Sequence, residues 1–165
     1  MAKKILIIED DRDLREGLHF AFESDGYMVF DAETKKQGLT EIKKGIYDMV
    51  LLDCNLPDGL GFDLCRQVRE YSDIPIFMLT ARDTEMDEIK ALTLGVNDYL
   101  RKPFSLGVLK ARIKRILAEK REPKRLVSGN IAVDKNLCKV TRNQEEIPLS
   151  KLEYRLLLYL VENKN

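Results

Sequence analysis

A set of polar residues spread along the first two thirds of the chain could together do chemistry on a phosphoryl group. They are Asp10, Asp11, Asp53, Thr80 and Lys102. Three carboxylates brought close together repel one another, and a divalent cation relieves that repulsion. Mg²⁺ suits such oxygen ligands, shared with water and phosphate. A carboxylate beside the ion can attack phosphorus and form an aspartyl phosphate, while Mg²⁺, Lys102 and the Thr80 hydroxyl would stabilise the transferred group.

The local sequence around Asp53 makes it the candidate nucleophile. Four apolar residues, Met49 to Leu52, run directly into Asp53, and a Leu-Pro-Asp-Gly turn follows. A short apolar run that ends in turn residues predicts a strand buried on both faces. Asp53 is therefore expected at the C-terminal end of that strand, the edge where open α/β sheets bind ligands.

Strand-like and helix-like segments alternate along residues 1–120. Apolar runs that predict strands occupy 5–8, 27–30, 49–52, 74–79 and 98–100. Amphipathic patterns that predict helices occupy 14–22, 39–46, 64–71, 86–92 and 106–117. This alternation indicates an α/β domain with a five-stranded parallel sheet and helices on both faces. Because the carboxyl ends of parallel strands share one edge, the polar residues that follow them are expected to meet there.

The pattern changes after residue 120. Residues 121–125 are charged and contain proline, and we interpret them as a linker. Residues 126–165 contain short strand-like segments, a capping box at Ser150-Lys151-Leu152-Glu153, and a helix over 151–162 that is apolar nearly all round. Such a helix needs partners on several sides. We therefore expect a small β-rich segment and one helix that form an incomplete second domain.

Composition limits the classes of protein that remain. The chain has 165 residues, 44% of them hydrophobic and 34% charged, with 28 basic and 28 acidic side chains. That is typical of a globular protein. The three cysteines have no metal-ligand spacing, which favours a reduced, structural role. No signal peptide or membrane span is predicted, so a cytoplasmic location is expected, with no membrane contact.

Residues 1–120 resemble the receiver domain of two-component response regulators. The likeness rests on Asp10-Asp11, Asp53 with Leu56-Pro57 and Gly61, Thr80-Ala81 and Lys102-Pro103-Phe104. It implies a flavodoxin-like fold with strand order 2-1-3-4-5. It also implies that Asp53 takes a phosphoryl group from a sensor histidine kinase, with Thr80 and Lys102 assisting.

The same resemblance implies a set of ligands for Mg²⁺. Asp11 and Asp53 would bind the ion through their side chains, Asn55 through its backbone carbonyl, and Asp10 partly through water. The Lys102–Pro103 bond is expected to be cis.

Tyr99 matches the switch aromatic of the family. On phosphorylation Thr80 would move toward the phosphoryl group, Tyr99 would turn into the space it leaves, and the 85–118 face would change. The protein would thus be a phosphorylation switch that catalyses its own phosphotransfer, not a turnover enzyme.

Residues 98–104 and 111–113 resemble the OmpR-like subclass, transcription factors with a winged-helix DNA-binding domain. That subclass forms homodimers through the 85–118 face, and Lys90, Asp98 and Arg112 match participants in its cross-subunit ion pairs. Val108 stands where the subclass usually has Glu, and Asn97 stands where an acid is common.

Residues 126–162 resemble the first strands and first helix of the winged-helix domain, with Leu149-Ser150 and Glu153-Tyr154 as the matching signature. The recognition helix and wing would follow and are absent from this chain. Specific DNA binding is therefore expected only of the full-length protein, in regulating transcription.

Two other interpretations stay open at this point. An aspartyl-phosphate phosphatase or mutase usually carries a second Asp two residues after the nucleophile, and Asn55 occupies that position. A pure interaction module of the same fold would have no use for an acid cluster, whose repulsion would only reduce stability. Treating the protein with Mg²⁺ and a small phosphodonor distinguishes all three.

Overall fold

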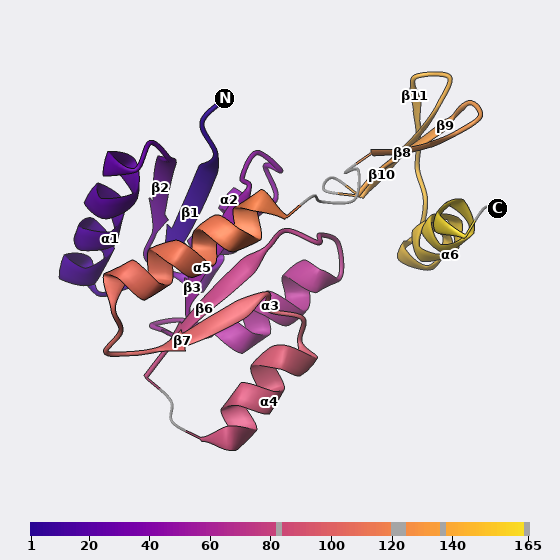
Figure 1. Cartoon of the computed structure of the whole chain (residues 1–165). Coiled ribbons are helices and arrows are strands. Elements are labelled where there is room, and N and C mark those ends of the chain that lie inside the picture. The colour runs from indigo at the N-terminus through magenta and orange to yellow at the C-terminus, as the bar shows by residue number, and fades with distance from the viewer. Residues whose placement is uncertain (82–83, 120–124, 136–137, 164–165) are drawn as a thin grey trace. The chain divides into compact units, whose positions relative to one another are not determined.

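The computed structural model describes residues 1–81, 84–119, 125–135 and 138–163. The chain divides into two compact units, the first built from Met1–Glu70 and Ile74–Glu119. In Figure 1 the first unit runs from β1 to α5. Its elements are β1 (Lys4–Ile8), α1 (Arg12–Ser24), β2 (Met28–Ala32), α2 (Lys35–Ile42), β3 (Met49–Asp53), β4 (Asn55–Leu56), β5 (Gly59–Leu60), α3 (Gly61–Arg69), β6 (Ile76–Thr80), α4 (Glu85–Thr93), β7 (Asp98–Arg101) and α5 (Leu106–Ala118).

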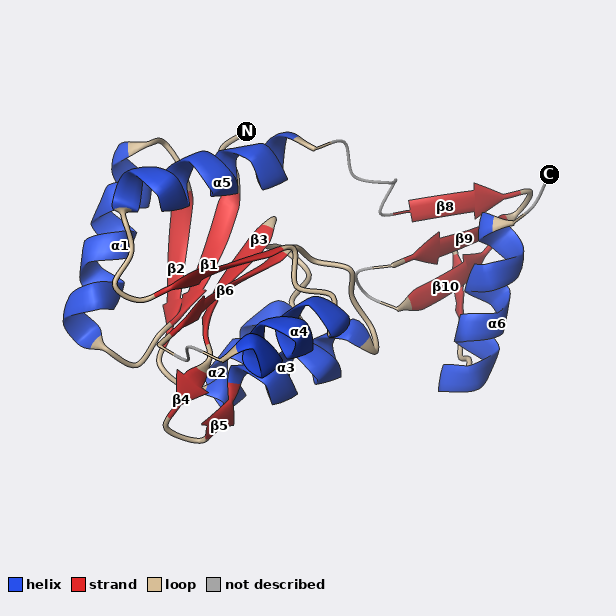
Figure 2. Cartoon of the chain, turned by 60° about the horizontal axis from the view of Figure 1, so that its bottom comes forward, coloured by secondary structure: helices blue, strands red, loops and turns tan. Residues whose placement is uncertain are grey.

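Five parallel strands form the central sheet, in the order β2-β1-β3-β6-β7. This confirms the predicted sheet and its 2-1-3-4-5 order, with β6 and β7 as the fourth and fifth long strands. In Figure 2 helices α1 and α5 cover one face, and α2, α3 and α4 cover the other. The short antiparallel hairpin β4–β5 was predicted only as a turn.

The core lies on both faces of this sheet, because successive side chains of a strand point to opposite faces. All residues of β3 and β6 are buried, as the continuous apolar runs predict. One hydrophobic cluster lies between the sheet and the helices α1 and α5. Its buried members are Ile5, Ile7, Leu18, Phe22, Val29, Met49, Leu51, Phe77, Leu79, Leu109, Ile113 and Ile116.

The second unit contains an antiparallel sheet and one helix. Its elements are β8 (Arg125–Ser128), β9 (Ile131–Asp134), β10 (Lys139–Arg142), β11 (Glu145–Ile147) and α6 (Lys151–Glu162), with strand order β11-β10-β9-β8. The predicted capping box is confirmed: Ser150 accepts from the Glu153 amide and Glu153 accepts from the Ser150 amide. Val133, Val140 and Tyr154 form the small core.

Parts of the predicted domain boundary fall outside the described residues. Positions 121–124 of the expected linker lie there, and Arg125, the last residue of that linker, is the first residue of β8. Within the described part of the chain, no helix is long and apolar enough to cross a membrane.

Candidate functional site

Asp53 is the last residue of β3 and is 5% exposed. The backbone amide of Asn55 donates to its Oδ1 at 3.3 Å, and Lys102 Nζ lies 3.3 Å from the same oxygen. The next residue, Cys54, donates its amide to the Leu79 carbonyl at 2.8 Å. Pairing with β6 therefore continues past the strand end, and Asp53 lies at the C-terminal end of a buried strand, as predicted.

The carboxylates beside Asp53 belong to Glu9 and Asp10. One carboxylate oxygen from each of these three residues lies within 4.8 Å of the others. Glu9 is 1% exposed, whereas Asp10 is exposed to solvent. The structure thus brings Asp10 to Asp53, as expected, together with a residue that the sequence analysis did not select.

Asp11 is not part of this cluster, so the structure does not bring this predicted side-chain ligand to Asp53. Its carboxylate caps α1 by accepting from the Leu14 amide at 3.0 Å. The physical reason is that α1 begins at Arg12, so Asp11 takes the N-cap position and turns toward the free amides of the first turn. Glu9 could have been found from the sequence, because it is the first polar residue after an apolar run, as Asp53 is.

Lys102 bridges the two buried acids. Its Nζ donates to Glu9 Oε2 at 2.8 Å in addition to its contact with Asp53, and its backbone amide donates to the Thr80 carbonyl at 2.8 Å. The Lys102–Pro103 bond is cis, as expected. Partial burial works to lower the pKa of Lys102, but the hydrogen bond that Lys102 donates to Glu9 and the charge of Asp53 outweigh it and raise that pKa. The lysine is therefore firmly protonated.

The pKa of Glu9 is raised in this crowded site. Burial raises the pKa of its carboxyl, the hydrogen bond with Lys102 opposes that rise, and the charge of Asp53 adds to it. Burial is the main cause of this raised pKa, and the charge of Asp53 is the smaller one, so both effects make Glu9 harder to ionise. The lysine alone does not fully compensate the cluster.

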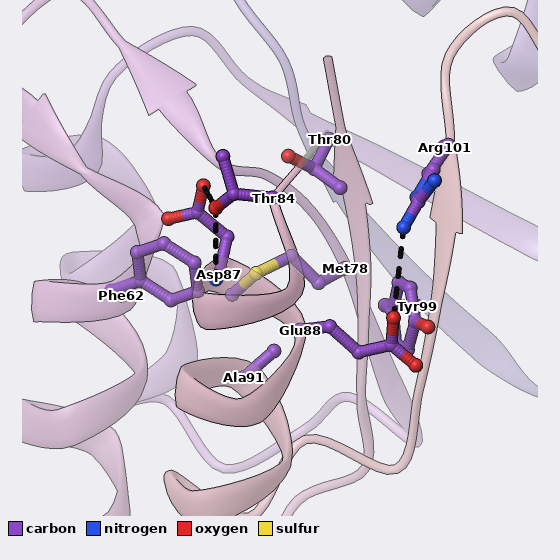
Figure 3. Close-up of a pocket in the computed structure, with 9 residues that line it drawn as sticks. All are labelled: Phe62, Met78, Thr80, Thr84, Asp87, Glu88, Ala91, Tyr99 and Arg101. Carbon is purple, nitrogen blue, oxygen red and sulfur yellow. Dashed lines mark hydrogen bonds and ion pairs between the residues drawn. The ribbon is translucent and has the colours of Figure 1, made fainter. Parts of the chain in front are cut away.

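Thr80 ends β6 and is 7% exposed. It lines a small pocket of about 10 Å³, roughly the space of one water molecule. The pocket residues are Phe62, Met78, Thr80, Thr84, Asp87, Glu88, Ala91, Tyr99 and Arg101. Figure 3 shows Phe62 at one end of this pocket and Tyr99 at the other, where Tyr99 lies beside Glu88 and Arg101. The predicted switch pair, Thr80 and Tyr99, therefore faces one shared space.

The residues predicted for a dimer face have partners inside the chain. Asp98 forms ion pairs with Arg112 at 3.2 Å and Arg115 at 3.3 Å. Lys90 lies over the ring of Phe62, with Nζ 4.8 Å from its centroid. Asn97, which stands where the subclass commonly has an acid, accepts from the Ile76 amide at 3.0 Å through its side-chain oxygen. These contacts account for the side chains without a second subunit.

Comparisons with known proteins agree with this geometry. Residues 5–114 match the family described as the response regulator receiver domain. The protein KdpE of Escherichia coli, named as the transcriptional regulatory protein of the KDP operon, is 40% identical over 163 residues, covering 96% of this chain and 72% of that protein. The response regulator ArlR of Staphylococcus aureus is 37% identical over 162 residues, covering 98% and 74%.

Solved structures show the same likeness. The non-phosphorylated receiver domain of HemR from Leptospira biflexa is 34% identical with a TM-score of 0.69, covering 73% of this chain and 98% of that chain. DrrB of Thermotoga maritima, described as an OmpR/PhoB homologue, is 27% identical with a TM-score of 0.67, covering 99% and 74%. On the sequence match, the shared fold and the strand-end site taken together, the chain belongs to the response regulators with a receiver domain, in their OmpR-like class.

Proposed function

We propose that Asp53 accepts a phosphoryl group from the phosphohistidine of a sensor histidine kinase. An Asp53 carboxylate oxygen attacks phosphorus and forms an acyl phosphate bond. The phosphorus–nitrogen bond breaks, its electron pair stays on the imidazole, and that imidazole takes a proton from solvent. Lys102 lies within reach of the nucleophile and would hold the phosphoryl oxygens, and Thr80 would donate its hydroxyl to them.

We further propose that Glu9, Asp10 and Asp53 hold Mg²⁺, with the Asn55 carbonyl as an additional ligand. The donor set fits, because these are hard oxygen ligands with atoms within 4.8 Å of one another. The charge of Asp53 contributes to the raised pKa of Glu9, and a cation held between the two carboxylates would relieve that repulsion. When bound, the ion would supply charge neutralisation for the carboxylates and for the incoming phosphoryl oxygens.

The single observation that carries the proposal is the position of Lys102. Its ammonium group lies 2.8 Å from Glu9 and 3.3 Å from Asp53, although Lys102 comes from the opposite end of the unit's sequence. A buried ion pair of this kind contributes little to stability by itself. Its placement beside Asp53, the proposed phosphoryl acceptor, is what phosphoryl transfer requires.

The output of the switch is proposed to be dimerisation through the 85–118 face, and regulation of transcription, as the name of KdpE states for that protein. Support comes from the small pocket that Thr80 and Tyr99 both line, which would have to enlarge, as Thr80 moves, for the Tyr99 ring to enter it. It also comes from exposed apolar side chains on α4 and α5, among them Ile89, Leu92 and Val108. Val108 in place of a glutamate would make this interface more apolar than ionic.

Intact-protein mass spectrometry after treatment with Mg²⁺ and acetyl phosphate tests the proposal. Wild type is expected to gain one phosphoryl group, and Asp53→Asn none. Asp10→Asn and Asp11→Asn form a matched pair, because both remove one exposed carboxylate from neighbouring positions. The first is expected to need much more Mg²⁺ for the same yield, and the second to behave as wild type.

Each result decides between the interpretations. A phosphoryl adduct on Asp53→Asn, or none on wild type, would contradict the proposal and favour an inert interaction module. Rapid release of many equivalents of phosphate would favour a phosphatase. An effect of Asp11→Asn equal to that of Asp10→Asn would contradict the assignment of Glu9 and Asp10 as the acidic pair.

A further inference from the structure

A buried arginine lies directly behind the acidic cluster. Arg15, on the first turns of α1, is 7% exposed. Among the described residues, the buried charged side chains are Glu9, Arg15, Asp53 and Lys135. Two of these four, Glu9 and Asp53, belong to the proposed phosphoryl-transfer site. Burying a charge is costly unless it is well paired, so the partners of Arg15 indicate what its burial achieves.

The guanidinium binds the backbone of the two residues that carry the site's acids. Its Nη1 donates to the Glu9 carbonyl at 2.8 Å and lies 3.4 Å from the Asp10 carbonyl. Its Nη2 donates to Glu33 Oε1 at 2.8 Å. The planar fork of arginine can hold several acceptors in fixed geometry, which a lysine ammonium cannot do in the same way.

These contacts hold the segment in which the chain leaves β1 and enters α1. The Glu9 amide donates to the Ala32 carbonyl at 3.0 Å, which extends the pairing with β2, and the Asp11 carboxylate caps α1. Between these two points the direction of the Glu9 and Asp10 side chains depends on the intervening carbonyls. Those are the carbonyls that Arg15 binds.

We infer that Arg15 is a positioning residue for the cation site: its guanidinium holds the Glu9 and Asp10 backbone so that both carboxylates face Asp53. This inference rests on the proposed function of that site. It assigns to Arg15 a role opposite to that expected from its charge alone. A positive charge near a cation site disfavours cation binding, so removing it would strengthen binding if only Coulomb repulsion mattered. If Arg15 positions the ligands, removing it weakens binding.

The test is the half-saturating Mg²⁺ concentration, measured by NMR titration of the unphosphorylated protein with MgCl₂. Arg15→Lys keeps the charge and loses the fork, and Arg15→Gln loses both. Both are expected to raise the half-saturating concentration about tenfold or more, the size seen when a group that orients a metal ligand is removed. Melting temperature, recorded on the same samples, reports any loss of stability separately.

Arg12→Gln is the matched control. Arg12 lies on the same turn of α1, its side chain is 78% exposed, and it pairs at the surface with Glu16 at 2.8 Å. This variant is expected to leave Mg²⁺ binding unchanged or slightly tighter. Glu33→Ala is a second variant, which removes one partner of Arg15 from a side chain that is 62% exposed. It is expected to raise the half-saturating concentration less than the Arg15 variants do.

The outcomes separate the inference from the proposed function. Wild type that binds no Mg²⁺ and gains no phosphoryl group would overturn both. Wild type that binds Mg²⁺ while Arg15→Lys binds it within twofold, or Arg15→Gln binds it more tightly, would overturn the inference alone. If neither Arg15 variant folds, Glu33→Ala decides: weaker binding supports the role of Arg15, and unchanged binding overturns it.

Discussion

At the scale of single residues, Gly61 is required by how closely α3 approaches the nucleophile. A Cβ at this position would lie 2.5 Å from the Asp53 carbonyl oxygen and 3.1 Å from the Cys54 Cα. Both are backbone atoms that cannot rotate away. We expect Gly61→Ala to lower the free energy of unfolding by about 1–3 kcal/mol, a typical cost of overpacking, and to slow phosphorylation of Asp53.

Urea unfolding and the acetyl phosphate reaction measure the two effects. Gly17→Ala is the control, since a Cβ there would meet nothing within 4 Å and Gly17 lies inside α1. That change is expected to stabilise the protein by about 0.5–1 kcal/mol. Equal behaviour of the two variants would contradict the steric argument.

The raised pKa of Glu9 predicts an acid-sensitive cation site. A carboxyl must lose its proton to bind a metal, and an ordinary glutamate does so around pH 4.3. Because burial and the charge of Asp53 raise the pKa of Glu9, protons compete with Mg²⁺ at a higher pH than that. The half-saturating Mg²⁺ concentration should therefore rise on acidification from neutral pH, by up to about tenfold per pH unit below the pKa.

Mg²⁺ titrations at several pH values check this expectation. Glu9→Gln removes the titrating group, so it should bind Mg²⁺ more weakly at neutral pH and with a flatter dependence on pH. A wild-type profile that stays flat down to the ordinary glutamate range would contradict the prediction.

At the scale of structural elements, Asp58 ties the β4–β5 hairpin to α2. Its Oδ1 accepts from the Lys35 amide at 2.7 Å and its Oδ2 from the Lys36 amide at 2.9 Å. These amides belong to the first turn of α2, where backbone N–H groups have no acceptor within the helix. The hairpin begins two residues after Asp53, so the tie also steadies the segment that carries the Asn55 carbonyl.

We expect Asp58→Asn to lower the melting temperature at neutral pH by a few degrees. Slight desolvation works to raise the pKa of Asp58, but the amides of Lys36 and Lys35 outweigh it and lower that pKa. A carboxyl whose pKa is lowered by folding stabilises the protein above its unfolded pKa, and this contribution is lost as the pH falls through the folded value. The difference from wild type should thus disappear in acid. For Asp63→Asn, whose carboxylate pairs with Arg66 at the surface of α3, it should be small at every pH, because exposed ion pairs contribute little.

Most of these elements could be predicted from the sequence. The five strands and their order follow from apolar runs of strand length that alternate with helical periodicity. The β4–β5 hairpin was predicted only as a turn, because its strands are two residues each and leave no periodic signal. Likewise, Ala32 and Asp31 belong to β2 although the apolar run ends at Phe30, since pairing with β1 extends the strand.

At the scale of the whole molecule, the 85–118 face is the surface through which phosphorylation should promote dimerisation. Ile89 is 50% exposed on α4 and Val108 is 43% exposed on α5. With the phosphoryl mimic beryllofluoride and Mg²⁺, wild type is expected to dimerise. Ile89→Asp should raise the dimer dissociation constant at least about tenfold, or 1.4 kcal/mol, because an unpaired carboxylate would be buried at the interface.

Light scattering after size-exclusion chromatography measures this change. Phe20→Asp is the matched control, since Phe20 is an exposed apolar residue, 74% exposed, on α1. It should dimerise as wild type does. Loss of the dimer in both variants, or in neither, would contradict the assignment of the interface.

The sequence by itself determined the class of fold and placed Asp53, Thr80 and Lys102 at one edge of the sheet, where the proposed chemistry would take place. Each of these follows from residue type and position at the end of an apolar run. Only the tertiary structure decided which acids accompany Asp53. Glu9, Asp10 and Asp11 are adjacent and chemically similar, so their roles depend on where α1 begins. Because the helix starts at Arg12, Asp11 is drawn to its free amides, and Glu9, held by Lys102 and Arg15, lies beside Asp53 instead.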